Sequence, residues 1–167
     1  QSNVNASGNG GDILIGTANN TLDISGPGSI TAQTKGAGKG GKLDLQGTTI
    51  TLDQGVRATT ETSGTGDGGQ INLSANTITL NQGAAATAET SGSGEGGLIA
   101  VDTNSLTLSG ASQLTTETSG QGQAGVINLN RGTARDLTIG LRDQQSTINA
   151  QSNVNASGNG GDILIGT

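Results

Sequence analysis

The sequence predicts an all-β fold, a parallel β-solenoid with about 28 residues and three short strands in each coil. The first observation behind this prediction is a recurring glycine, usually the second of a Gly-Gly pair. Its positions are separated by 30, 28, 28, 28 and 36 residues: Gly11, Gly41, Gly69, Gly97, Gly125 and Gly161. A repeat of this length is typical of units that stack on one another.

The second observation is that aliphatic residues recur in pairs with one residue between them, which is the period of a strand. The first pair of each unit is Ile13/Ile15, Leu43/Leu45, Ile71/Leu73, Ile99/Val101, Ile127/Leu129 and Ile163/Ile165. The second pair is Leu22/Ile24, Ile50/Leu52, Ile78/Leu80, Leu106/Leu108 and Leu137/Ile139. A weaker third stripe is Ile30/Ala32, Ala58/Thr60, Ala86/Ala88, Leu114/Thr116 and Ile148/Ala150. Three strands per unit predict a three-sided coil, and the chain has five coils plus the start of a sixth.

Composition narrows the classes of function. The chain has 29% hydrophobic residues, 31 glycines and no aromatic residue, but its aliphatic residues are confined to the repeated columns, so a narrow interior can still form. Without histidine or cysteine, the usual general bases, thiol nucleophiles and thiolate metal ligands are absent. We therefore expect no enzyme activity and no cofactor. The net charge of −6 argues against nucleic acid, and no apolar run is long enough for membrane insertion.

The glycines match a dinucleotide-binding pattern, Gly-x-Gly-x-x-Gly, four times, beginning at Gly36, Gly64, Gly92 and Gly120. A strand follows each match, whereas a dinucleotide site requires a helix there. We expect tight corners instead, with positive φ angles and close contact between coils. The residue before each Gly-Gly pair varies from Asp67 to Lys39, and a lysine does not fit a calcium site.

One face carries a ladder of like charges, with Glu61, Glu89 and Glu117 at intervals of 28 residues and Gln33 one coil earlier. Carboxylates about 5 Å apart repel by roughly 1 kcal/mol in water. A solvated acidic face of this kind discourages lateral aggregation between molecules. We expect no resident metal, and weak bridging of divalent cations between fibres is the alternative. Threonines form an adjacent outward column, Thr31, Thr59, Thr87 and Thr115, which β-propensity explains.

The fifth unit is the most irregular and the most charged. We expect about three extra residues near positions 131–135, three near 141–145 and two near 153–154. Insertions in a solenoid map to loops on its surface. The candidate interaction residues are Arg131, Arg135, Asp136, Arg142 and Asp143, and a lengthened, solvated turn is the alternative.

The units, in forms such as GGQINLSANTITLNQGAAATAETSGSGEGG, resemble the repeats of filamentous haemagglutinin-like exoproteins of the two-partner secretion route. The resemblance covers nearly the whole chain. It implies a right-handed parallel β-helix, an extracellular or cell-surface location, and a role as an adhesin or a matrix fibre. The expected partners are further copies of the chain, joined end to end, and surface glycans or other cells. A glycan-binding or glycan-cleaving β-helix is the second hypothesis, although no aromatic platform for a sugar is present.

Residues 151–167 repeat residues 1–17 without a single change, whereas neighbouring 28-residue units differ at most outward positions. A second, longer period of 150 residues is therefore indicated. We interpret residues 1–167 as a single solenoid segment, in which 1–150 form one block and 151–167 begin the next. An engineered duplication is the alternative.

If the block belongs to a tandem array, the parent protein should continue after Thr167 with a sequence close to Ala-Asn-Asn-Thr-Leu-Asp-Ile. At about 4.8 Å per coil, each block would advance the fibre by roughly 24 Å. Sequencing the parent gene and averaging filament images test both expectations. An unrelated globular domain after Thr167 would refute the array.

Overall fold

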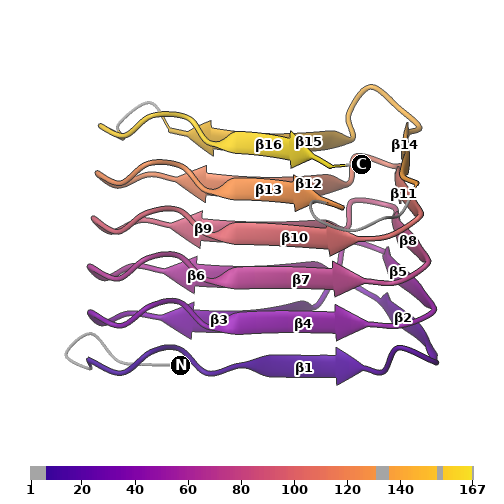
Figure 1. Cartoon of the computed structure of the whole chain (residues 1–167), viewed down its shortest axis with the longest axis horizontal. Coiled ribbons are helices and arrows are strands. Elements are labelled where there is room, and N and C mark those ends of the chain that lie inside the picture. Colours follow the sequence, from indigo (N-terminus) through magenta and orange to yellow (C-terminus); the bar gives the residue numbers. More distant parts are fainter. Residues whose placement is uncertain (1–6, 131–135, 154–155, 167) are drawn as a thin grey trace.

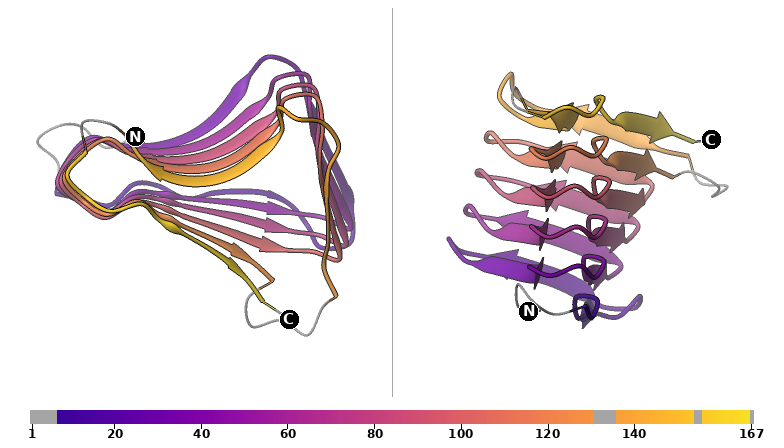
Figure 2. Two further views of the ribbon diagram at one scale, coloured as in Figure 1. Left: turned by 90° about the horizontal axis from the view of Figure 1, so that it is seen from above. Right: turned by 90° about the vertical axis from the view of Figure 1, so that its left-hand side faces the viewer.

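The computed structural model describes residues 7–130, 136–153 and 156–166, and their strands form a right-handed parallel β-helix (Figure 1). The chain runs left to right along the front of Figure 1, returns behind, and rises from the N-terminus to the C-terminus. Seen from above in Figure 2, the coil has three sides, and two of them converge at a narrow corner. The described residues form sixteen strands and no helix, which confirms the predicted fold class.

Each side of the coil is one parallel sheet. The first sheet contains β1 (Ile13–Gly16), β4 (Lys42–Gln46), β7 (Gln70–Ser74), β10 (Leu98–Asp102), β13 (Val126–Leu129) and β16 (Asp162–Ile165). The second contains β2 (Thr21–Ser25), β5 (Thr49–Asp53), β8 (Thr77–Leu80), β11 (Ser105–Leu108) and β14 (Thr138–Leu141). The third contains β3 (Ser29–Thr34), β6 (Arg57–Thr62), β9 (Ala85–Thr90), β12 (Gln113–Thr118) and β15 (Thr147–Ser152).

Strand register follows the spacing of the repeat. In the first sheet, β1 pairs with β4 at a separation of 30 residues, the next three pairs are separated by 28, and β13 pairs with β16 at 36. The predicted interior columns are therefore in register, and in the middle coils they are fully buried. Stacked aliphatic side chains, rather than a large globular core, fill the interior.

Threonine hydroxyls line the interior at the narrow corner, a feature that sequence reasoning missed. Thr34 and Thr118, the last residues of β3 and β12, each donate to the carbonyl five residues further on. Ser152 takes the same place in the last described coil and donates to the carbonyl of Asn159. These bonds tie the end of the third strand to the glycine-rich corner that leads to the next coil.

The corner glycines are required by close stacking, and the prediction of positive φ for them was wrong. A Cβ added to Gly64, Gly92 or Gly120 would lie 1.5–1.7 Å from the carbonyl oxygen of the equivalent glycine one coil earlier. None of these three residues has a positive φ. Among the described residues, positive φ occurs instead after the first strand, at Gly16 and Asn130, and in the turn between the second and third strands, at Gly26, Gln54/Gly55, Gln82/Gly83 and Gly110/Ala111.

The fifth coil differs from its prediction. Ile139 and Leu141, rather than Leu137 and Ile139, continue the interior column of Leu106 and Leu108. The register lengthens to 33 residues in the second sheet, 34 in the third and 36 in the first. The eight extra residues therefore divide as five before β14, one after it and two after β15, and the predicted division of three, three and two was wrong.

Asn130 ends β13 ahead of the longest insertion. It is buried and has a positive φ of 53°. Its side-chain amide accepts from the N–H of Thr103 at 2.8 Å and donates to the carbonyl of the same residue, so it takes the place of a backbone neighbour. An asparagine tolerates the left-handed conformation and offers both groups in one side chain. The Asn130 side chain thus satisfies the backbone of Thr103 in the coil below.

Gly92→Ala should destabilise the fold by about 3 kcal/mol or more, because the new Cβ would overlap a backbone oxygen that cannot move without breaking the coil stack. Gly28→Ala is the matched control, since a Cβ there meets nothing within 4 Å. We expect the control to be neutral or slightly stabilising. Urea unfolding of both variants measures the difference, and equal stabilities would contradict the close-stacking explanation.

Candidate functional site

The acidic ladder lies on the outer face of the third sheet. Glu61 pairs with Glu89, and Glu89 pairs with Glu117, so the three carboxylates occupy one column of β6, β9 and β12. The strands of this sheet bow inward, which makes their outer side concave (Figure 2). A hollow of about 110 Å³ runs along the ladder and is lined by serines as well as by the glutamates.

Amide side chains complete the ladder at both ends. The Nε2 atom of Gln33 donates to Glu61 at 2.6 Å, as its place in the column suggested. Gln151, the next member of the column, donates to Glu117 at 3.3 Å, and Asn153 also donates to Glu117. The sequence analysis missed these two residues, because the insertions of the fifth unit change their spacing from the rest of the column to 34 and 36 residues.

Glu89 occupies the centre and accepts no side-chain hydrogen bond within the described part of the chain. Burial raises the pKa of Glu89 above its usual range, and the charges of Glu61 and Glu117 raise it further, while Arg57 opposes them. The folded state therefore binds a proton at Glu89 more tightly than the unfolded chain does. Stability should fall as pH rises from the ordinary glutamate value, about 4.3, through the raised value.

The ladder is a line of carboxylates rather than a cage around one point. Among the described residues, no group of three or more histidine, cysteine, aspartate or glutamate side chains has an arrangement that could hold a metal ion. Cation bridging between two fibres would use glutamates from two chains, so it remains a prediction.

The threonine column beside the ladder faces outward, as predicted, but it is not open to solvent. Thr59, Thr87 and Thr115 are only 6–7% exposed. They lie in the same strands as the glutamates, two residues before them and on the same face. The threonine hydroxyls are thus a poor surface for a macromolecular partner.

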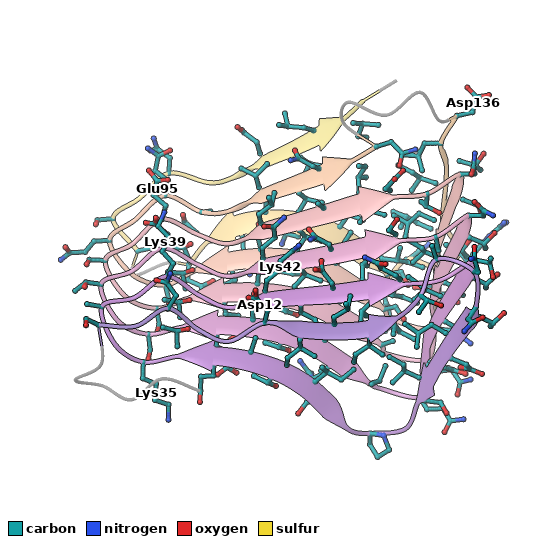
Figure 3. The ribbon with its side chains drawn as sticks, turned by 60° about the horizontal axis from the view of Figure 1, so that its bottom comes forward. Asp12, Lys35, Lys39, Lys42, Glu95 and Asp136 are labelled. Atoms are coloured by element: carbon teal, nitrogen blue, oxygen red, sulfur yellow. The ribbon has the colours of Figure 1, made fainter. Side chains whose placement is uncertain are left out.

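The glycine corner carries an ion pair between coils. Lys39 Nζ lies 3.1 Å from a carboxylate oxygen of Asp67, and the backbone N–H of Glu95 donates to the same carboxylate from the coil above. The hydrogen bond from Lys39 lowers the pKa of Asp67, and the bond from Glu95 adds to it. Figure 3 shows Lys39 and Glu95 along this edge. This column therefore contains an attractive pair, Lys39 and Asp67, which the glutamate ladder lacks, although Glu95 repeats the negative charge in the next coil.

A polar hollow of about 340 Å³ lies on the outer face of the first sheet and was not predicted. Lys42 pairs with Asp44 at 2.7 Å on one side of it, and Asn72 donates to Asp44. Asp44, Asn72, Ala100 and Asn128 are in register in four successive coils. Because the side chain of Ala100 is short, it leaves a gap between Asn72 and Asn128. The Oδ1 atom of Asn128 is buried and has no hydrogen-bond partner among the described residues. Ala100, a small residue in an otherwise polar column, is the feature of the sequence from which this hollow could have been predicted.

Of the five candidate interaction residues of the fifth unit, three lie within the described residues. Arg131 and Arg135 lie outside the described residues. Asp136 and Arg142 are exposed, and Figure 3 shows Asp136 at the edge of the molecule away from Lys39. The structure does not bring Asp136 or Arg142 together with either hollow, since the described linings of both consist of other residues.

Asp143 has a structural role in its turn. Its carboxylate accepts from the N–H groups of Gln145 and Ser146, from the Ser146 hydroxyl and from the N–H of Gly110 in the coil below. Burial would raise the pKa of Asp143, but these hydrogen bonds together lower it. The carboxylate that the sequence marks as a candidate contact therefore holds the loop on the coil beneath.

Comparison with known proteins adds no identity. No family model, characterised protein or solved structure matches the chain. Within the described residues there is no helix of the length and apolarity that crossing a membrane demands.

Glu89→Gln should raise the free energy of unfolding at pH 7 by roughly 0.2–1 kcal/mol, the range for a cross-strand charged pair, because it removes the central charge of the ladder. The gain should disappear below about pH 4, where glutamates are protonated in the folded and unfolded chain. Urea unfolding across this pH range measures it. Asp23→Asn is the control, since Asp23 is exposed and pairs with Thr51. An equal gain at both pH values would contradict the repulsion.

Proposed function

We propose that this chain is a structural and adhesive segment of an extracellular or cell-surface fibre, of the filamentous haemagglutinin-like type that the sequence resembles. The proposal is supported by the role of the repeated residues in stacking the coils. Nearly every repeated column serves the stacking of one coil on the next, and the described surface has only shallow hollows. Such a chain is suited to a long, rigid structure rather than to catalysis.

The observation that carries the proposal is the continuous register of the three sheets, which stacks each regular coil on an equivalent one. When residues 1–167 are isolated, interior aliphatic residues of the last coil are exposed: Leu141 is 50% exposed, Ile163 42% and Ile165 61%. The outer edges of β14, β15 and β16 also have no strand above them in this chain. An apolar surface bordered by free backbone donors and acceptors is a template for strand addition.

The sides of the solenoid disfavour lateral contact, which leaves the axis as the direction of growth. The net charge of the chain is −6, and the glutamate ladder spans three successive strands of the third sheet. Repulsion between charged side faces acts against side-by-side aggregation without blocking the ends. Axial stacking of like-charged rods is consistent with a thin fibre.

A glycan-binding or glycan-cleaving β-helix is the second candidate, and the polar hollow on the first sheet favours it. The hollow is lined by carboxylate, amide and ammonium side chains, including Asp44, Asn128 and Lys42, which are groups that hydrogen-bond to sugar hydroxyls. A cleaving enzyme would additionally need a general acid and a base or nucleophile. The fibre is the simpler proposal, because it uses the whole chain.

The chain should associate in a concentration-dependent manner and form filaments one solenoid wide, because the apolar end faces gain burial when they meet. Sedimentation velocity and negative-stain microscopy measure this. Ile165→Lys should weaken association, since it places a charge in the interior column of the end face. Leu164→Lys is the matched control, because its register partner, Asn128, belongs to the outward column. Strict monomers of the unmodified chain at high concentration would contradict the fibre.

A glycan array and a reducing-sugar assay separate the two candidates. Specific binding that Asn128→Ala abolishes, in a chain that stays monomeric, would favour the second one. Filaments without glycan binding would favour the structural reading.

A further inference from the structure

A lysine, an aspartate and an asparagine meet on the outer face of the first sheet. Lys42 and Asp44 belong to β4, and Asn72 belongs to β7 in the next coil. Lys42 Nζ lies 2.7 Å from Oδ2 of Asp44, and Asn72 Nδ2 donates to the other carboxylate oxygen, Oδ1. One carboxylate therefore contacts an amine of its own coil and an amide of the following coil at the same time.

The strand register allows this amine and this amide to reach each other. Lys42 is in register with Gln70, and Asp44 with Asn72, so Lys42 and Asn72 are diagonal neighbours on adjacent parallel strands. The spacing of strands and residues places the Cα atoms of such neighbours about 8 Å apart, which the two side chains together can span. The side chain of Asp44 is 18% exposed and that of Lys42 39%, so the contact is partly shielded from solvent.

Hydrogen bonds fix the orientation of the Asn72 amide. Gln70 Nε2 donates to Asn72 Oδ1 at 2.7 Å, while Asn72 Nδ2 faces Asp44. An ionised carboxylate can only accept, so the reverse orientation of the Asn72 amide would place its oxygen against the Asp44 oxygen. The amide nitrogen is thus next to a carboxylate, and the amide oxygen is next to a hydrogen-bond donor.

These positions meet the requirements of acyl transfer from an amide to an amine. A lysine nitrogen attacks a carbonyl carbon only after it has given up a proton, and Asp44 is a base within proton-transfer distance of Lys42. Gln70 donates to the Asn72 oxygen, which gains negative charge as the carbon becomes tetrahedral. The leaving nitrogen must be protonated, and Asp44 contacts this nitrogen as well.

We propose that Lys42 and Asn72 react to form an isopeptide bond that joins β4 to β7. The bond between Lys42 Nζ and Asn72 Cγ forms, and the bond between Asn72 Cγ and Nδ2 breaks. The lysine ammonium carries three protons, of which one stays on the new amide. The other two pass through Asp44 to Nδ2, which leaves as ammonium. Asp44 returns to its ionised state, and no oxidant, reductant or further reactant is consumed.

This inference goes beyond the proposed function, because the bond lies within one chain and does not require that the chain form a fibre. It closes a covalent loop between two successive coils, which the ladder of β4 and β7 otherwise joins by hydrogen bonds. A cross-link of this kind restricts the unfolded chain. The second and third coils should therefore resist unfolding more strongly than they do without the bond.

Intact-mass spectrometry of the purified 167-residue chain tests the bond. We expect a mass below that of the sequence by one ammonia molecule, either on purification or after prolonged incubation. Trypsin does not cleave after an acylated lysine, so a digest should contain residues 40–57 joined to residues 58–131. Lys39 is the internal control, since its partner Asp67 accepts from a backbone N–H rather than from a side-chain amide. Trypsin should cleave after Lys39.

Lys42→Arg is the matched variant, because it keeps the positive charge beside Asp44, but its guanidinium stays protonated and does not attack. Asn72→Ala removes the carbonyl carbon, and Asp44→Asn keeps the shape of the side chain but removes the base. All three variants should keep the full mass of their sequence, and Lys42→Arg should unfold at a lower urea concentration than the cross-linked chain.

The full sequence mass in the unmodified chain after incubation, with normal tryptic cleavage after Lys42, would overturn the proposal. A loss of ammonia that persists in Lys42→Arg would also overturn it, because another group would then be the source. A joined peptide that persists in Asp44→Asn would overturn the role of Asp44 as the base.

Discussion

The structure depends on the backbone ladder that runs from each coil to the next. With few exceptions, a residue's neighbour in its sheet is the residue 28 positions further along the chain, and the same separation governs many bonds in the turns, such as that from the N–H of Asn104 to the carbonyl of Asn76. Because the ladder fixes the distance between equivalent residues at about 4.8 Å, each position of the repeat must tolerate a copy of itself above and below. This requirement explains most of the composition. Aliphatic residues and threonine pack well on themselves, and glycine is needed where the backbones meet face to face.

The same requirement makes a column of charges costly, and the chain moderates this cost in two ways. At the glycine corner, Lys39 precedes Asp67, so the charges of these two successive coils attract one another. On the third sheet the glutamates do repeat, but amides occupy the ends of the column, and Gln33 and Gln151 donate to the outer carboxylates. The repulsion is therefore concentrated on Glu89, which has a carboxylate neighbour on both sides.

Periodicity in the sequence was sufficient for the fold class, the three strands of each coil and the register of the regular units, because one column assignment determines all of its repeats. It failed where the period is broken. Leu137, Ile139 and Leu141 all satisfy a period of two, and both Leu137 and Ile139 pack against the core, so the period alone does not show that Ile139 and Leu141 are the partners of Leu106 and Leu108. The corner glycines were identified, but sequence does not distinguish a need for positive φ from a need for close approach. The hydroxyls of Thr34 and Thr118 were missed because their acceptors lie on the far side of a turn. Of the candidate sites, the glutamate ladder was predicted, whereas the hollow beside Asn128 depends on a gap that one alanine opens.

The parallel arrangement of the strands gives the solenoid a direction. In all three sheets each strand pairs in parallel with the equivalent strand of the next coil, so a contact that continued the sheets would be head to tail rather than self-complementary. Head-to-tail contacts form closed rings only when the rotation between copies is large enough, and otherwise they continue into open filaments. Parallel coils stack along a common axis with a small rotation at each step, as the near superposition of successive coils in Figure 2 indicates. A fibre of the proposed kind, whose joints preserved this stacking and its direction, would therefore be an open filament.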